Sequence, residues 1–419
     1  MAGLYIHIPF CKSRCIYCGF YSTTHLDLRQ RYVDALCREM MLRGERTEVR
    51  GQKSEGRDQR AEGRDQRAEG RSERIETVYL GGGTPSQLTT EQLRQLFIYI
   101  NKVYGLDHTD HTEPPREVTI EMNPDDVTVE YAAVLQQLPI NRVSLGAQTF
   151  DDERLRFLHR RHTAAQVSRA VSILRSAGIR NISIDLMYGF PGETLSDWQR
   201  DIDAALALDV EHISAYCLMI EEGTPLARMM EQATVPGAST PGSSSNEELE
   251  RAMYELLIDK LTANGYEHYE ISNFARLGYR SCHNSSYWHD VPYIGLGAAA
   301  HSYDFSPLPS PNGERVRRRS WNVSDIRAYI EAIERGELPS EGEVLSDASH
   351  YNERVMLGLR TCEGIDLTTL SDHHRSYCLR EAEPFLKDGL LRRNQDSLIL
   401  TRRGLFVSDM VMSSLMLED

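Results

Sequence analysis

Six short runs typical of β-strands occur in the first half of the chain, and in four of them apolar and polar residues alternate with a period of two. Between them, apolar residues recur every three to four positions, as in amphipathic helices. Strands that alternate with helices predict a parallel sheet, either open or closed into an incomplete (β/α) barrel. The expected strands are 3–8, 75–80, 117–123, 142–148, 181–187 and 211–219, and the expected helices are 26–43, 89–104, 128–138, 151–177 and 195–208.

Four of these strands have one polar and one apolar face, because alternate side chains along a strand share a face. Parallel strands in α/β proteins are commonly apolar on both faces. We therefore expect the polar faces to point into a barrel that holds a large polar cofactor, with helices on the apolar side. A sheet with an exposed edge is the alternative, but agreement among the four strands favours the barrel. The polar-face residues are Tyr5, His7, Thr119, Glu121, Asn123, Ser144, Gly146, Gln148, Ser183 and Asp185.

Three cysteines, Cys11, Cys15 and Cys18, lie directly after the first expected strand. Their spacing brings soft thiolates together in one short loop, which suits ligation of an iron–sulfur cluster. A closed zinc site would need a fourth ligand, and His7 or His25 is the alternative that would supply it. A cubane cluster held by three cysteines instead leaves one iron with an open coordination position.

A glycine-rich turn, residues 81–84 (GGGT), follows the second expected strand and precedes a helix. Its glycines remove each Cβ at the carboxyl end of a strand, where α/β proteins form their sites. The turn lacks the Gly-Lys-Ser/Thr ending of a Walker loop. We expect Gly82, Gly83 and Thr84 to contact a cofactor through a backbone that the ligand can touch directly.

Polar residues on the inner strand faces are further candidate ligands of a cofactor. Glu121 and Asp185 can accept hydrogen bonds from an ammonium group or from ribose hydroxyls, and Ser144 and Gln148 can bond ribose or carboxylate oxygens. Arg160, early in the expected helix 151–177, could pair with a carboxylate. The alternative for each is a satisfied polar network inside the barrel and, for Arg160, a solvated surface position.

The composition is that of an ordinary soluble protein of about two to three domains, with 419 residues, 40% hydrophobic and 26% charged. The net charge of -15 argues against nucleic acid as a main partner, because neutralising phosphates requires a basic surface. We find no apolar run that could span a bilayer and no secretory signal, so we expect at most peripheral membrane contact. The cysteines outside the loop are scattered like reduced thiols, which indicates a cytoplasmic protein.

A charged repeat interrupts the strand–helix pattern. The heptapeptide EGRDQRA occupies 55–61 and again 62–68, within a stretch, 44–74, that has almost no apolar side chains. Such a stretch cannot contribute to a core, and heptads without apolar first and fourth positions do not form a coiled coil. We interpret 44–74 as a solvated insertion, disordered or marginally helical, without a catalytic role.

The second half of the chain contains two stretches that combine histidine, aromatic and small residues, 282–288 (CHNSSYW) and 294–303 (IGLGAAAHSY). They could receive a flat macrocycle, with a histidine or cysteine ligating its iron and aromatic rings stacking on it. A packed junction between domains is the alternative.

The predicted organisation has three parts. The segment 231–246, rich in Pro, Gly, Ser and Thr, is expected to be a flexible loop before a helix at 247–264. The tail is expected to be helical with a hairpin at 389–401 and a last helix at 403–416, an order similar to winged-helix domains. With the acidic charge, this tail is predicted to be a lid or docking domain rather than a DNA reader. The predicted parts are 1–225 (the partial barrel), 226–320 (a barrel extension and junction) and 321–419 (the C-terminal domain).

The cysteine loop and the glycine turn resemble those of the radical S-adenosylmethionine (SAM) superfamily. Its CxxxCxxC loop binds a [4Fe–4S] cluster whose open iron is chelated by SAM, and its glycine motif receives the SAM amino group. Over nearly the whole chain except 44–74, the sequence resembles the oxygen-independent coproporphyrinogen III oxidase group. The resemblance is carried by residues 4–11 (LYIHIPFC), 81–85 (GGGTP), 121–124 (EMNP), 144–148 (SLGAQ) and 185–192 (DLMYGFPG).

This resemblance implies an α/β fold, a partial (β/α)₆ TIM-like barrel with a helical, winged-helix-like C-terminal domain. It also implies that five residues lie where the oxidases contact SAM. They are Tyr5, Glu121, Gln148, Arg160 and Asp185.

Two features favour the heme chaperone branch of this group, HemW. The oxidases carry a further cysteine two positions after the third cluster cysteine, where this chain has Phe20. Residues 283–288 resemble the HNxxYW motif of the chaperones, which implies heme binding with His283 as a candidate ligand, and delivery of heme to respiratory membrane proteins. The alternatives are a coproporphyrinogen III oxidase, which decarboxylates porphyrinogen propionates, and a radical SAM enzyme with an unrelated substrate.

Deleting residues 51–71 is expected to leave folding and cluster content nearly intact, because the segment has no core residues. Thermal unfolding and iron content of the reconstituted protein measure the outcome. Aggregation of the deletion variant would contradict the interpretation of 44–74 as a solvated insertion.

Overall fold

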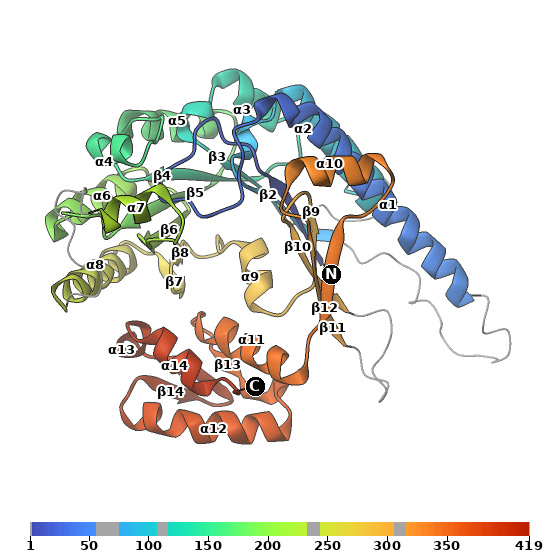
Figure 1. Cartoon of the computed structure of the whole chain (residues 1–419). Helices are drawn as coiled ribbons and strands as arrows, with labels where there is room; N and C mark the ends of the chain where they lie inside the picture. Colours follow the sequence, from blue (N-terminus) through green and yellow to red (C-terminus); the bar gives the residue numbers. More distant parts are fainter. Residues whose placement is uncertain (1, 56–74, 107–115, 233–243, 306–315, 419) are drawn as a thin grey trace.

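The computed structural model of the chain describes residues 2–55, 75–106, 116–232, 244–305 and 316–418. Figure 1 shows a curved sheet with helices α1 to α6 over its outer side and a smaller C-terminal domain below it. Two predicted segments lie largely outside the described residues. They are the C-terminal part of the predicted insertion, residues 56–74, and most of the predicted flexible loop, residues 233–243.

Twelve strands form one mixed sheet, in the order β12-β11-β10-β9-β1-β2-β3-β4-β5-β6-β8-β7. Strands β1 to β6 pair in parallel, each with the next along the chain, and β9 pairs in parallel with the other side of β1. The edge strands β12 and β7 do not pair with each other, so the expected partial barrel is confirmed. The parallel strands are β1 (Ala2–Ile8), β2 (Ile75–Gly82), β3 (Glu117–Met122), β4 (Arg142–Gln148), β5 (Asn181–Tyr188), β6 (His212–Cys217) and β9 (Tyr293–Leu296).

The outer face of the sheet is apolar and packs against helices in one core. In β1, for example, Leu4, Ile6 and Ile8 are fully buried, while the polar residues of this strand lie on the other face. None of the described helices is both long and apolar enough to cross a lipid bilayer. The covering helices are α1 (Arg29–Glu55), α2 (Thr90–Tyr104), α3 (Val129–Leu135), α4 (Asp152–Phe157), α5 (Ala164–Ser176) and α6 (Leu195–Ala207).

Two helical predictions need correction. Helix α1 continues to Glu55, so the first part of the predicted insertion is helical. The single helix expected over 151–177 is two helices, α4 and α5, because His159 has a left-handed φ of 60° that a right-handed helix cannot accommodate. Helix α5 then begins anew after Thr163, whose backbone N–H donates to Gln166 Oε1 at 2.8 Å. Arg160 therefore lies in a turn between helices rather than early in one.

The sheet continues well past the last expected strand. Helices α7 (Pro225–Glu231), α8 (Ser244–Ala263) and α9 (Cys282–Trp288) separate further short strands. The boundary expected at residue 321 falls inside β11, and the sheet extends to Val344, so the predicted helical tail starts with strands. These additional elements are β7 (Glu267–Glu270), β8 (Asn273–Ala275), β10 (His301–Phe305), β11 (Arg317–Asn322), α10 (Ile326–Glu334) and β12 (Ser340–Val344).

The C-terminal domain has its own core and a three-stranded sheet in the order β13-β15-β14. The hairpin expected for a winged-helix-like domain is present, but the single last helix expected over 403–416 is two short helices, α13 and α14. Ion pairs fix this domain to the barrel, among them Arg360 with the fully buried side chain of Glu270 at 2.7 Å. Its elements are α11 (Asp347–Leu359), β13 (Ile365–Asp366), α12 (Asp372–Lys387), β14 (Leu391–Asn394), β15 (Ser397–Leu400), α13 (Arg402–Leu405) and α14 (Ser408–Leu415).

A buried carboxylate joins the start of the barrel to its extension. Glu39 of α1 is fully buried and accepts hydrogen bonds from Tyr329 Oη at 2.6 Å and Asn322 Nδ2 at 2.9 Å. It also accepts from the backbone N–H of Gly297 at 2.9 Å and pairs with Arg43 at 2.7 Å. One side chain therefore ties together α1, the turn after β9, β11 and α10.

Replacing Glu39 by alanine is expected to lower the free energy of unfolding by about 3–5 kcal/mol, because Arg43 and three other donors would lose their buried acceptor. Urea unfolding followed by circular dichroism measures the change. The control is Glu334→Ala, which removes a half-exposed ion pair with Arg31 and should cost less than about 1 kcal/mol. Equal losses in the two variants would contradict the anchoring role of Glu39.

Candidate functional site

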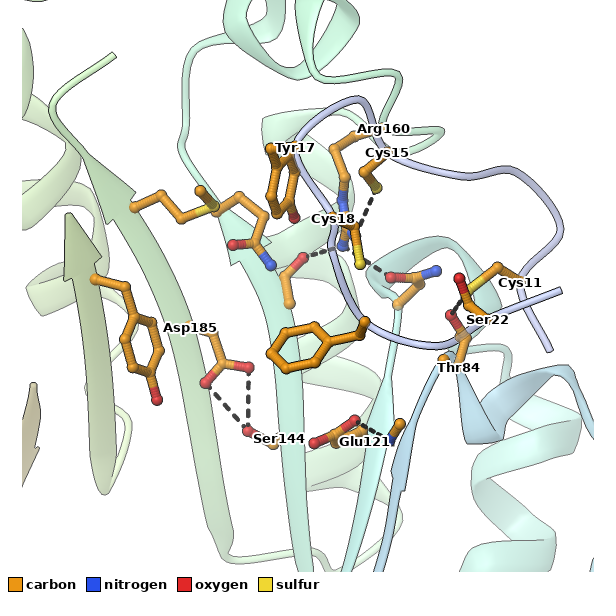
Figure 2. Close-up of a pocket in the computed structure, with 18 of the residues that line it drawn as sticks. Cys11, Cys15, Tyr17, Cys18, Ser22, Thr84, Glu121, Ser144, Arg160 and Asp185 are labelled. Atoms are coloured by element: carbon orange, nitrogen blue, oxygen red, sulfur yellow. Dashed lines mark hydrogen bonds between the residues drawn. The ribbon is translucent and has the colours of Figure 1, made fainter. Parts of the chain in front are cut away.

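A cavity of about 650 Å³ lies on the inner face of the sheet, where the parallel strands end. Figure 2 shows cysteines and Arg160 at one side of it and the carboxylates of Glu121 and Asp185 at the other. All residues predicted for the site line this cavity except Tyr5 and His283. Those that line it are Cys11, Cys15, Cys18, Gly82, Gly83, Thr84, Glu121, Ser144, Gln148, Arg160 and Asp185.

The cysteine loop extends from β1, an interior strand that lies between β9 and β2. Its entry is fixed by a backbone hydrogen bond from Cys11 N–H to Thr23 O at 2.9 Å, and its end by one from Cys18 N–H to Cys15 O at 3.4 Å. Cys11 Sγ lies 3.5 Å from Thr84 Oγ1 in the neighbouring glycine turn. Burial raises the pKa of the Cys11 and Cys18 thiols. Binding a metal would have to provide the charge that keeps these thiolates ionised.

The donor geometry does not fit a single metal ion. Within the part of the chain that the structure describes, no three His, Cys, Asp or Glu side chains are grouped as one ion would require. His7, the alternative zinc ligand, has its Nε2 3.1 Å from Tyr21 O and its Nδ1 3.1 Å from Tyr5 Oη. Cysteines around a cubane cluster need not converge on one point, because each ligates a different iron. The loop therefore fits a cluster better than zinc.

The glycines of the turn are required by the fold as well as by any ligand. A Cβ on Gly82, which has φ of 107°, would come within 2.5 Å of the His7 ring, and one on Gly83 within 2.6 Å of the Pro9 carbonyl carbon. The turn thus lies directly against the start of the cysteine loop. This close packing gives the glycines a structural reason that the sequence interpretation did not include.

Arg160 enters the cavity from the turn between α4 and α5. Its Nη2 donates to Asn123 Oδ1 at 2.7 Å and to Gly146 O at 2.5 Å, and its Nη1 lies 3.7 Å from Cys15 Sγ. Its Nε is buried and has no hydrogen-bond partner among the described residues. The guanidinium is therefore held beside the cysteine loop, not on the solvated surface, and could receive a carboxylate there.

Three polar groups line the side of the cavity away from the cysteines. Glu121 accepts from Tyr79 Oη at 2.8 Å and from Gly82 N–H at 3.2 Å, while Asp185 accepts from Ser144 Oγ at 3.2 Å. Burial is the main cause that raises the pKa of Glu121 to about 7, and it also raises that of Asp185. Groups of this kind would ionise readily when a cation such as an ammonium or sulfonium group lies beside them.

The direction of the Gln148 side chain is set by a strained backbone. It has a left-handed φ of 68°, and the pairing of β4 with β5 is interrupted by a bulge between Gly146 and Gln148. Bulges and left-handed non-glycine residues redirect side chains at functional sites. Simple alternation along the strand predicted the face but not this distortion.

Several cavity residues were missed in the sequence. The period of two could have found them, since Arg142 lies two positions before Ser144, and Ser214 and Tyr216 share one face of β6. Arg142 is 1% exposed, and its Nε and Nη1 have no hydrogen-bond partner among the described residues. The missed lining residues include Tyr17, Tyr79, Arg142, Met187, Ser214, Tyr216 and Asn284.

The comparisons with known proteins agree with this geometry. Residues 5–205 match the model of the radical SAM superfamily, and residues 345–407 match that of the HemN C-terminal domain. Among solved structures, the coproporphyrinogen III oxidase of Escherichia coli has the same fold, with a TM-score of 0.73 and 20% identity over 99% of this chain and 89% of that one.

Relatives named heme chaperone HemW align with the chain along its length. The one from Bacillus subtilis is 31% identical over 100% of both chains. The one from Mycobacterium tuberculosis is 32% identical over 99% of this chain and 94% of its own. The chain belongs to the HemW family.

The match of residues 5–205 to the radical SAM model implies a [4Fe–4S] cluster and SAM, and the HemW cavity has groups suited to both. The thiols of Cys11, Cys15 and Cys18 would hold the cluster. The buried Nε of Arg160 and the carboxylate of Glu121 would match the carboxylate and ammonium of the SAM amino acid. Once bound, the pair would supply one-electron chemistry, and these residues would orient it.

The two remaining predicted residues lie behind the cavity wall of this HemW family member. The ring of Tyr5 stacks on that of Tyr79 with centroids 6.3 Å apart, and the ring of His283 stacks on the same tyrosine at 5.1 Å. His283 is 1% exposed, its Nδ1 lies 2.8 Å from Thr77 Oγ1, and its Nε2 lies 2.8 Å from Tyr287 Oη. Both ring nitrogens are engaged, so ligation of heme iron by His283 would require one of these contacts to break.

Glu121→Gln is expected to change the pH dependence of stability. Because the pKa of Glu121 is about 7 in the folded protein and ordinary in the unfolded chain, the folded state binds the extra proton between about pH 4.5 and 7. The stabilisation that protonated Glu121 gives to the folded state is therefore complete at lower pH and is lost as the pH rises through 7. Relative to Glu121→Gln, the native protein should lose up to about 3 kcal/mol between pH 5 and pH 8.

Thermal unfolding of both proteins across this range, in the same buffers, measures the difference in Tm. If the Tm of the two proteins changed in parallel with pH, Glu121 would not have a raised pKa.

Proposed function

We propose that this protein is a heme chaperone of the cytoplasm. It binds heme, holds a [4Fe–4S] cluster on Cys11, Cys15 and Cys18 with SAM beside it, and passes heme to respiratory membrane proteins. The observation that carries the proposal is the full-length similarity, at 31% identity, to a relative named heme chaperone. The similarity spans the barrel, its extension and the C-terminal domain.

The second candidate is an oxygen-independent coproporphyrinogen III oxidase, which the fold of the Escherichia coli oxidase and the polar cavity favour. The position of the additional cysteine of the oxidases speaks against it. Phe20 is 74% exposed and lies at the cavity lining, so an apolar side chain replaces a thiol at that place. A phenyl ring cannot transfer a proton or a hydrogen atom as a thiol can.

The test begins with the full chain, reconstituted anaerobically with iron and sulfide. Heme titration followed by absorbance should give a saturable Soret band at about one heme per chain. In parallel, the same protein is incubated with SAM, a low-potential reductant and coproporphyrinogen III, and the porphyrinogen products are separated. The chaperone proposal expects stoichiometric heme binding and no loss of propionate carboxyl groups.

Formation of protoporphyrinogen by the unmodified protein would overturn the chaperone assignment in favour of the oxidase. Phe20→Cys is the matched variant for this assay, because it restores the thiol at an exposed position without disturbing the core. Absence of heme binding by protein whose cluster is intact would also refute the proposal.

A further inference from the structure

A second depression, a groove of about 870 Å³, lies outside the cavity described above, where β10, β11 and β12 begin or end. Its wall combines an exposed histidine, His301, with the indole of Trp321 and several small or apolar side chains. The apolar and small residues of the wall are Ala299, Val323, Leu338 and Pro339. The volume is in the range of sites for cofactor-sized ligands.

His301 and Trp321 form a fixed pair. They are directly opposite each other on the antiparallel strands β10 and β11, and their rings are 6.0 Å apart between centroids at 33°. Backbone hydrogen bonds from Ala299 N–H to Val323 O and from Asn322 N–H to Ala300 O, each 3.0 Å, hold the preceding turn against β11. The imidazole is thus presented by a rigid frame, as a preorganised ligand should be.

His301 differs from His283 in the two properties that iron ligation needs. It is exposed, and no hydrogen bond to its ring nitrogens is found among the described residues, whereas both nitrogens of His283 are engaged in the protein interior.

We infer that His301 is the axial ligand of an iron porphyrin bound in this groove, with Trp321 against the macrocycle. The inference rests on the proposed heme-binding function and gives it a site different from the HNxxYW histidine. The Nε2 or Nδ1 lone pair forms a coordinate bond to iron and displaces a weakly held water, without any change in oxidation state. The apolar wall covers part of the porphyrin face, and the open side of the groove leaves the ligand accessible for transfer.

The groove also determines how the porphyrin would be oriented. Glu341 and Glu343 line its β12 side, and Arg319, the cationic lining residue, is held by Glu353 at 2.5 Å and by Glu343 at 3.7 Å. The carboxylates would repel the propionates of a heme. The propionates therefore point away from β12 and toward solvent.

The groove and the cysteine loop lie on the same face of the sheet and at the same edge, where the parallel strands β1 and β9 end. His301 and Trp321 lie on the sheet face that also carries Tyr293 and Tyr5, as the strand registers show. His301 follows the carboxyl end of β9, the strand parallel to β1, whose own carboxyl end leads into the cysteines. Cluster and heme would thus bind to neighbouring parts of one sheet edge.

The experiment compares heme titrations of the reconstituted full chain with those of three histidine variants. In His301→Ala, we expect heme affinity to fall by about tenfold or more and the spectrum of a histidine-ligated heme to disappear. Added imidazole should restore that spectrum in this variant, which a merely structural defect would not allow. His283→Gln, which keeps hydrogen-bonding capacity but cannot ligate iron, tests the HNxxYW histidine as the competing ligand. The control is His373→Ala, an exposed histidine of α12, which should bind heme as the native chain does.

Trp321→Ala should keep the histidine-ligated spectrum while binding heme about threefold to tenfold more weakly. Native affinity and spectrum in His301→Ala would overturn the inference but leave the heme chaperone proposal standing. Loss of ligation in His283→Gln alone would overturn it in favour of the HNxxYW histidine. Absence of heme binding by the native chain would instead refute the proposed function itself.

Discussion

Charges confined to the inner face of the sheet are the constraint on which the rest of the barrel depends. Arg142 is 1% exposed and Glu117 is 2% exposed, and the two lie near each other at the amino ends of adjacent strands. Desolvating such groups is costly unless opposite charges and hydrogen bonds compensate. Because these side chains cannot join an apolar core, the interior stays hollow and polar. The same Glu117 accepts from the backbone N–H groups of Cys282 and His283, at 2.8 and 3.0 Å, and so fixes α9 under the barrel.

The structure assigns to different parts of the molecule two features that the sequence motifs had suggested for one segment: support of the cofactor cavity and an imidazole that faces solvent. The HNxxYW segment forms α9, and its histidine braces Thr77 of β2 and the ring of Tyr79, which in turn donates to Glu121 of the cavity. The histidine supports the cofactor site from behind, while Asn284 of the same segment lines the cavity. Solvent-facing imidazole is found instead at His301, in the strand extension that distinguishes this sheet from a simple six-stranded barrel. A protein that must release its cargo benefits from a ligand at the surface, since buried groups exchange only after local opening.

The strands were predictable because alternation with a period of two is a property of the chain alone, and β1 to β6 agree with the expected ranges to within a few residues. The turn that carries Arg160 was not, since the left-handed φ of His159 leaves no mark in the apolar pattern. The strands β11 and β12 were missed because their residues are mostly polar or partly exposed, so no alternation marks them. Arg142 was overlooked for a related reason: a buried arginine is recognisable only once the carboxylates of other strands are placed around it.

The position of β1 has a consequence for biosynthesis. One of the two neighbours of β1, the strand β9, and the buried donors around Glu39 of α1 lie more than about two hundred residues further along the chain. Until that part of the nascent chain is made, one edge of β1 is unpaired and the carboxylate of Glu39 lacks most of its donors. The pairing of β1 on both of its edges, and with it the frame from which the cysteine loop extends, is therefore completed only after β9 has been synthesised.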